Sequence, residues 1–168
     1  GAYSEAAALR YTDHADLLAC ESFEQVFDAV GQGKATHGVL PVENSIGGSI
    51  HRSYDLLLEH DLPIVGEVQL VITHNLMALP GTTIDELTRI YSHPQALAQC
   101  ERFLRALPHV AVEATYDTAG SAKLVKEKHL VGAGAIASER AAQVFGLEIL
   151  KSEIQDFSDN ITRFLVIS

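Results

Sequence analysis

Short apolar runs alternate with amphipathic segments along the chain, and this alternation is the feature that most narrows the possible folds. Strand-like runs occupy residues 16–20, 37–42, 63–79 and 161–168. Between them lie stretches with apolar residues three and four positions apart, such as 22–33, which is the spacing of a helix with one buried face. Strands that alternate with helices in this way predict an α/β fold with mostly parallel sheets and helices on both faces.

The alternation occurs twice, on either side of the long extended segment 63–79, which predicts two lobes. We expect lobe 1 to comprise approximately residues 1–73 plus 161–168 and lobe 2 approximately residues 74–160, with a cleft between them. Periodicity alone does not establish that the last strand returns to lobe 1. Two-lobed folds of this kind close on a ligand.

Composition and charge exclude several classes of protein. Hydrophobic residues make up 47% of the 168 residues and charged residues 20%, which is typical of a globular domain. The net charge of −10, from 12 basic and 22 acidic residues, argues against nucleic-acid binding. No apolar run approaches the roughly 20 residues needed to cross a bilayer, so we expect no membrane partner. Cys20 and Cys100 lie far apart, and the eight histidines form no ligand pair, so we expect a reducing compartment and no metal.

Polar segments mark the predicted junctions between strands and helices. A helix N-terminus offers unpaired N–H groups and the positive end of the helix dipole, so such junctions suit anions. Several of them together would hold a small molecule rich in carboxylates. The segments are 1–5, 41–50, 92–100, 116–122 and the strand start 159–164.

The presence of a polar residue in these segments can be explained either by a function or by local structure. Asn44 and Ser45 offer directional hydrogen bonds, or they belong to a plain turn. Ser92 fits an N-cap before a helix that begins near Pro94. Capping does not explain Gln99, a polar residue among apolar neighbours. The chain has no Gly-x-Ser-x-Gly nucleophile motif and no phosphate-binding glycine loop, so hydrolase and nucleotide-binding readings are disfavoured.

The C-terminal stretch "SDNITRFLVIS" places a polar group at the start of a buried strand. In α/β sheets such strand ends are where ligands meet side chains. The alternative is an ordinary turn at Asp159 and Asn160, a strand threonine at Thr162 and a solvated Arg163.

Four motifs in order, "GAYSEAA", "GVLPVENSIGGSI", "YSHPQALAQC" and "SDNITRF", resemble the catalytic domain of the prephenate and arogenate dehydratases. The resemblance covers essentially the whole chain. It implies two α/β lobes similar to type II periplasmic binding proteins, with the active site in the cleft between them. It also implies no cofactor and a homo-oligomer, either dimer or tetramer.

The resemblance implies a role for individual residues. Thr162 would donate a hydrogen bond to the leaving hydroxyl group, and Arg163 would add positive charge, or support the fold, since alternation points it away from Thr162. The segment 117–121 would receive a carboxylate through Thr118 and backbone amides. The implied catalytic residues are Thr162, Asn44, Ser92 and Gln99. The implied substrate-binding residues are Ser4, Ser45, Gly47, Gly48, Thr118, Arg163 and Phe164.

The implied reaction is a step of phenylalanine biosynthesis. A lyase of this family converts prephenate to phenylpyruvate, carbon dioxide and water, or arogenate to phenylalanine. The sequence leaves the two substrates open: Glu139 would favour the amine of arogenate, or it is a solvated residue in a helix's first turn. The alternative function is a non-catalytic binding module for a small carboxylate.

Two family features are missing from the sequence. The first helix has no strand before it, and no regulatory ACT domain follows the last strand, so we expect a fragment that lacks feedback control. The expected compartment is the cytoplasm, or the plastid if the protein comes from a plant.

Overall fold

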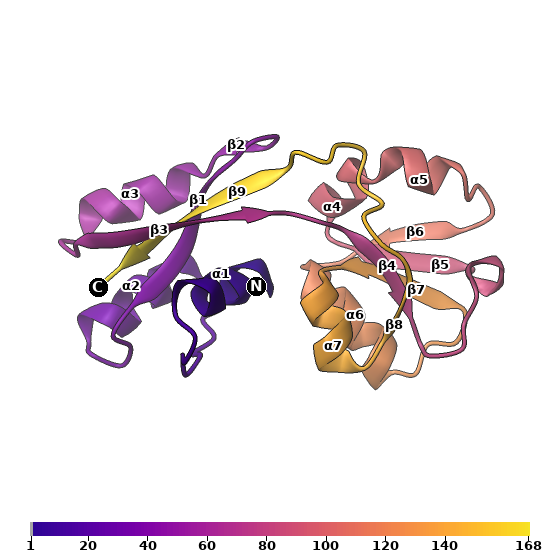
Figure 1. Cartoon of the computed structure of the whole chain (residues 1–168), viewed down its shortest axis with the longest axis horizontal. Helices are drawn as coiled ribbons and strands as arrows, with labels where there is room; N and C mark the ends of the chain where they lie inside the picture. The colour runs from indigo at the N-terminus through magenta and orange to yellow at the C-terminus, as the bar shows by residue number, and fades with distance from the viewer. Residues whose placement is uncertain (1) are drawn as a thin grey trace. The chain divides into compact units, whose positions relative to one another are not determined.

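The computed structural model describes residues 2–168, and the chain forms two compact units. The terminal unit consists of Tyr3–Ile72 and Asp159–Ser168, and the central unit consists mainly of Thr73–Ser158. Each unit contains one β-sheet (Figure 1). Gly1, the first residue of the expected junction 1–5, lies outside the described residues.

The terminal unit has a four-stranded sheet in the order β2-β1-β9-β3, and all of its pairings are antiparallel. Strand β9 comes from the C-terminal end of the chain and lies between β1 and β3, as the yellow arrow in Figure 1 shows. The elements of this unit are α1 (Ala2–Tyr11), α2 (Phe23–Gly31), β1 (Gly38–Asn44), β2 (Gly48–Ser49), α3 (His51–Glu59), β3 (Ile64–Val71) and β9 (Ile161–Ile167).

Helices cover both faces of this sheet. Successive residues of β9 point to opposite faces, so the strand contributes apolar side chains to the helices on each side. Phe164 packs with Ala7 of α1 on one face. Ile167 packs with Phe27 of α2 and Leu56 of α3 on the other. The apolar run at the end of the sequence is therefore buried on both sides, which fits its lack of polar alternation.

The central unit has a five-stranded sheet in the order β6-β5-β7-β4-β8. Helices α6 and α7 supply apolar residues to one core cluster, and α4 and α5 supply them to a second. The elements are β4 (Asn75–Ala78), the 3₁₀ turn η1 (Ile84–Glu86), β5 (Arg89–Ser92), α4 (Pro94–Gln99), α5 (Glu101–Arg105), β6 (Ala111–Ala114), α6 (Thr118–Glu127), β7 (Ala133–Ala137), α7 (Glu139–Phe145) and β8 (Glu148–Lys151).

The α/β class is confirmed, but the expectation of mostly parallel sheets is wrong for residues 2–168. Only β5 pairs in parallel, with β6 and with β7, and the remaining pairings are antiparallel. Parallel neighbours need a crossover connection that starts and ends in the same sheet. Strands β4 and β9 instead enter their sheets from the other unit, so no crossover helix sets their direction.

The expected strand at 16–20 is not formed. This segment has no regular structure, and its two leucines, Leu17 and Leu18, are exposed. An isolated extended segment has no ladder hydrogen bonds, and within residues 2–168 no strand pairs with it.

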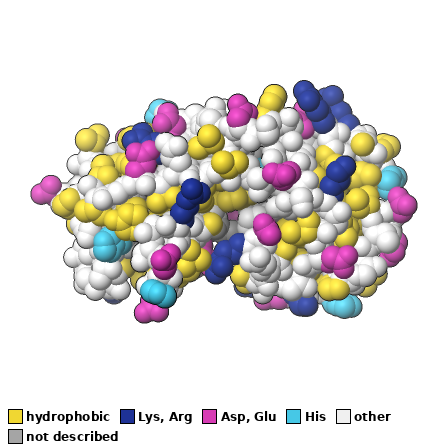
Figure 2. Space-filling view, viewed as in Figure 1, with side chains coloured by type: hydrophobic (Ala, Val, Ile, Leu, Met, Phe, Trp, Pro, Cys, Tyr) yellow, Lys and Arg dark blue, Asp and Glu magenta, His cyan; other side chains and the backbone are white. Residues whose placement is uncertain are grey.

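The described helices and the visible surface bear on the expected partners. No helix within residues 2–168 is long and apolar enough to span a bilayer. On the face shown in Figure 2, acidic and basic side chains are scattered among one another and are not gathered into a basic stripe.

Candidate functional site

The centre of the candidate site in the terminal unit is a cross-strand pair, Asn44 of β1 and Thr162 of β9. The pairing register shifts between Pro41 and Glu43, which leaves Val42 as an extra residue in β1. If the pairing of Pro41 with Phe164 continued without this shift, Glu43 would lie opposite Thr162. The bulge therefore brings an amide, and not a carboxylate, beside the threonine hydroxyl.

The Asn44 side chain is held by four hydrogen bonds. Its Oδ1 accepts from the backbone N–H groups of Ile46 (3.0 Å) and Gly47 (2.7 Å). Its Nδ2 donates to Asn160 Oδ1 (2.7 Å) and to Thr162 Oγ1 (2.8 Å). Backbone N–H groups can only donate, so the atom they meet must be the amide oxygen, and the orientation of Asn44 is defined by chemistry.

The Thr162 hydroxyl is consequently a directional donor. Its oxygen accepts from Asn44, so its own hydrogen points elsewhere. A hydroxyl group that accepts one hydrogen bond becomes a stronger donor of another. Thr162 is 9% exposed, which leaves it an edge that a small molecule can reach.

The loop after β1 is fixed to the residues that precede β9. Ser45 Oγ donates to the Asp159 carbonyl oxygen (3.0 Å) and accepts from the Ile161 N–H (2.8 Å). Gly48 has φ +83°, a backbone conformation that side chains disfavour, and a Cβ there would meet open space. The loop thus presents the exposed backbone of Gly47 and Gly48 next to the Asn44 amide.

Two residues of the Thr-Arg-Phe motif, Arg163 and Phe164, have partners within the fold. Phe164 is 1% exposed and packs in the core with α1, which favours a role in the fold. Arg163 points to the opposite face from Thr162, where its guanidinium donates to Glu67 Oε1 (2.7 Å) and lies 3.8 Å from Glu43. The hydrogen bond from Arg163 lowers the pKa of Glu67, and this pairing favours a role for Arg163 in the fold.

Ser4 lies inside α1, which begins at Ala2, so it does not cap the helix. Its side chain is half-buried. A role for Ser4 in binding substrate stays a prediction.

In the central unit, Gln99 at the end of α4 is paired with His74. The distance between His74 Nε2 and Gln99 Oε1 is 2.6 Å. His74 is 3% exposed, and burial lowers its pKa, while the hydrogen bond to Gln99 opposes this shift. A neutral His74 that donates from Nε2 holds the Gln99 oxygen and directs the Gln99 NH₂ group away from the histidine ring.

Ser92 is fully buried at the end of β5, and its hydroxyl donates to the Ile136 carbonyl oxygen at 2.7 Å. It is not the N-cap of α4, because His93 takes that position and its Nδ1 accepts from the Gln95 N–H. The hydroxyl group has no exposed surface, and its catalytic role stays a prediction. The structure therefore favours a role for Ser92 in fixing β5 against β7.

Thr118 is the first residue of α6, directly after the N-cap Asp117. The Asp117 carboxylate already accepts from the Gly120 N–H. The remaining donors of the first turn are the N–H groups of Thr118 and Ala119. The helix end is thus a weaker anion site than the sequence predicted, since a negative charge is already present there.

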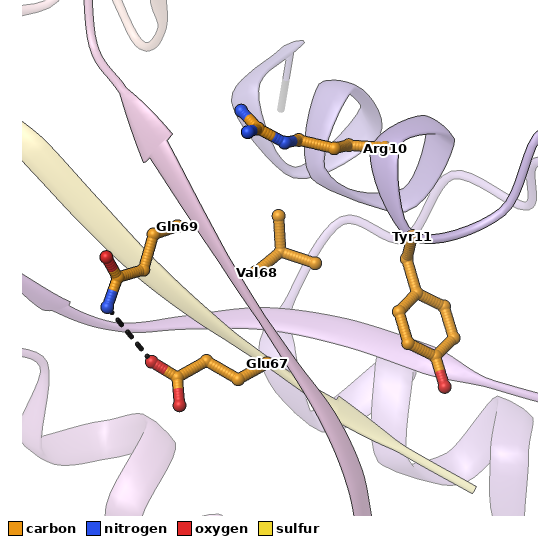
Figure 3. Close-up of a pocket in the computed structure, with 5 residues that line it drawn as sticks. All are labelled: Arg10, Tyr11, Glu67, Val68 and Gln69. Carbon is orange, nitrogen blue, oxygen red and sulfur yellow. Dashed lines mark hydrogen bonds between the residues drawn. The ribbon is translucent and has the colours of Figure 1, made fainter.

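Other places for a ligand are modest. Figure 3 shows an open pocket in the terminal unit, between Arg10 and Tyr11 of α1 and Glu67, Val68 and Gln69 of β3. No group of three or more His, Cys, Asp or Glu side chains within the described part of the chain is arranged to hold a metal ion. Burial raises the pKa of Cys100 to about 12, so this thiol is not a ready nucleophile.

Sequence reasoning did not assign a role to two buried polar residues, Asn160 and His74. Asn160 lies two positions before Thr162, and the two-residue period of a strand places both on the same face. His74 and Asn75 interrupt the long apolar segment 63–79. Both signals are visible in the sequence, but neither identifies the partner that makes the residue important.

The sequence matches the prephenate dehydratase family over residues 1–168. The chain therefore belongs to the prephenate dehydratase family. It is 51% identical over 168 residues to arogenate dehydratase/prephenate dehydratase 2, chloroplastic, of Arabidopsis thaliana, and 52% identical to arogenate dehydratase 2 of Petunia hybrida. These alignments cover 100% of this chain but only 44% and 42% of the relatives. The chain thus spans less than half the length of these relatives.

Two solved structures are similar over 99% of the chain. Prephenate dehydratase from Arthrobacter aurescens, solved in complex with L-Phe, has a TM-score of 0.87 and 30% identity, and 56% of that chain is covered. A protein described as GqqA, a novel type of quorum-quenching acylase, has a TM-score of 0.90 and 36% identity, with 60% covered. The fold of this chain is thus similar to proteins described with two different activities.

Proposed function

We propose that this chain is the catalytic part of a decarboxylating dehydratase, a carbon–oxygen lyase that acts on arogenate or prephenate in phenylalanine biosynthesis. Membership of the prephenate dehydratase family supports the class of reaction. The observation that carries the proposal is the hydrogen bond from Asn44 to Thr162, because it leaves a threonine hydroxyl group as a directed donor.

The reaction needs a donor at one place only. The ring carboxylate leaves as carbon dioxide, and its bonding electron pair enters the ring, which becomes aromatic. The ring C–O bond breaks, and the departing oxygen takes up a proton to leave as water. Because aromatisation drives the step, the enzyme has to orient the ring and assist the departing hydroxyl group.

Thr162 assists that hydroxyl group in our proposal. Threonine is a poor acid, so we propose that it polarises the departing oxygen and relays a proton rather than supplying one permanently. Asn44 keeps the Thr162 hydrogen pointed away from the amide that it accepts from. The catalytic role that the resemblance implies for Gln99, which lies in the central unit and contacts His74, stays a prediction.

The relatives' names favour arogenate as the substrate. Both plant proteins are described as arogenate dehydratases, and one of them also as a prephenate dehydratase. Glu139 is exposed in the first turn of α7, which favours its reading as a solvated residue and not as a selector for the amine. A plastid location is proposed only from the word "chloroplastic" in the Arabidopsis name.

The test is turnover of arogenate and prephenate, supplied separately, by the purified protein and by Thr162→Ala. We expect product from at least one substrate and a kcat lower by about 10²- to 10⁴-fold in the variant, the range for loss of a general acid. Thr162→Ser keeps a hydroxyl group and should retain more activity than Thr162→Ala. Ser53→Ala is the matched control, because Ser53 is buried in the same unit and donates only to the Pro41 carbonyl oxygen (2.7 Å).

Other outcomes have clear meanings. Binding of either compound without turnover would support the binding module instead. An absence of both, together with hydrolysis of an acylated amine, would support the activity named for GqqA. Full activity of folded Thr162→Ala would refute the role of Thr162.

A further inference from the structure

We propose that Asn160 is a positioning residue for the reaction: it orients the Asn44 amide, and through Asn44 it sets the direction of the Thr162 hydroxyl group. This inference rests on the proposed dehydratase function. Asn160 does not need to touch the substrate for this role, and with 1% of its surface exposed it is not placed to do so.

The Asn44 amide nitrogen has two hydrogens, and each has its own acceptor. One goes to Asn160 Oδ1 at 2.7 Å, and the other goes to Thr162 Oγ1 at 2.8 Å. The amide group is planar, so fixing one N–H direction fixes the other. Asn160 therefore helps to determine where Asn44 meets the threonine oxygen, and hence where the threonine hydrogen can point.

The backbone holds Asn160 in place for this task. Its carbonyl oxygen accepts from the Ile72 N–H at 2.7 Å, which ties it to the end of β3. On its other side, Ser45 bonds to Asp159 and Ile161, the residues that flank it. An acceptor anchored on both sides is pre-organised, so little reorganisation is needed when substrate binds.

Removing this acceptor should affect the rate of catalysis more than the stability of the fold. Without Asn160 Oδ1, one N–H of the half-buried Asn44 amide would lose its acceptor, and the amide would tilt to find another. A tilt of this kind displaces the donor to Thr162, and small misplacements of catalytic groups have large effects on rate.

The experiment compares Asn160→Leu, which keeps the branching of the side chain but has no acceptor, with Asn160→Asp, which keeps Oδ1. We expect kcat to fall about tenfold in Asn160→Leu, with KM within about twofold of the unmodified protein, and to recover in Asn160→Asp. In an Asn44→Ala background, Asn160→Leu should cause no further loss of kcat, because the two residues act in one chain. Ser53→Ala again controls for loss of a buried hydrogen bond in the same unit.

A second measurement does not depend on turnover. Side-chain amide exchange with water, followed by NMR at Asn44, should be slow in the unmodified protein and in Asn160→Asp but faster in Asn160→Leu. If the protein turns over neither substrate, the proposed function fails, while this measurement still decides the orientation of Asn44. The inference is overturned if exchange is the same in all three proteins, or if Asn160→Leu lowers kcat by the same factor with and without Asn44.

Discussion

The protonation state of one buried residue, His74, bears on both the fold and the candidate site. It is 3% exposed, and burial lowers its pKa because the charged ring would lose its hydration. The neutral ring can then donate from Nε2 to Gln99 Oε1 at 2.6 Å, which directs the Gln99 NH₂ group. Neutral His74 is therefore the form that suits both the fold and the proposed site.

His74 should make stability depend on pH. Above about pH 6.5 the ring is neutral in the folded and unfolded states, so it has no differential effect. As the pH falls below this value, the unfolded chain binds a proton first, and the free energy of unfolding decreases until the lowered folded-state pKa is reached. Urea unfolding at pH 7.5 and 5.5 should show a smaller loss of stability in His74→Gln than in the unmodified protein.

His109→Gln, a substitution at an exposed position, controls for the removal of a histidine. An equal loss of stability between the two pH values in the unmodified protein and in His74→Gln would contradict the prediction.

At the scale of elements, helix α2 packs closely on strand β1 at Gly38. A Cβ at this position would lie 2.7 Å from Val26 Cγ1 and 3.1 Å from Val30 Cγ2, both on α2. It would also lie 3.0 Å from Ile167 Cγ1 of β9. Valine side chains have few alternative rotamers, so the helix itself would have to move. Gly38 thus sets the distance between the helix and the sheet.

Gly38→Ala should destabilise the protein by about 1–3 kcal/mol, the usual effect of overpacking a core. Gly31→Ala is the matched control, because a Cβ there would meet nothing within 4 Å and alanine favours the helix. We expect Gly31→Ala to be neutral or slightly stabilising in chemical denaturation. Equal effects of the two substitutions would show that packing at Gly38 is looser than the structure indicates.

At the scale of the whole molecule, the terminal unit is built from two separate parts of the chain. Strand β9 lies between β1 and β3, so the last ten residues complete the centre of its sheet. The central unit is formed mainly by one segment, Thr73–Ser158. The sheet of the terminal unit therefore depends on the C-terminal residues, whereas the sheet of the central unit does not contain them.

Deleting residues 159–168 should unfold the terminal unit, because β1 and β3 would lose their shared neighbour and the core would lose Phe164 and Ile167. Amide hydrogen exchange should then show lost protection in β1 and β3 but retained protection in β5 and β7. Loss of protection in all four strands would show that the central unit does not fold without the terminal unit.

Much of this architecture could be predicted from the sequence. Periodicity located helix α2 and strands β1 and β9, and the extended segment 63–79 became β3 and β4. The motifs predicted the family that the comparisons show. The assignment of Thr162, Asn44 and Gln99 to catalysis stays a prediction that the proposed assays address.

The sequence by itself determined the elements and the family, because local periodicity, capping and short motifs depend only on neighbouring residues. The tertiary structure alone decided the strand directions and the partners of the polar residues. The bulge at Val42, which sets Asn44 opposite Thr162, and the pairing of Arg163 with Glu67 both join residues far apart in the chain. Register and long-range hydrogen bonds depend on which strands become neighbours, and no local pattern in the chain specifies that choice.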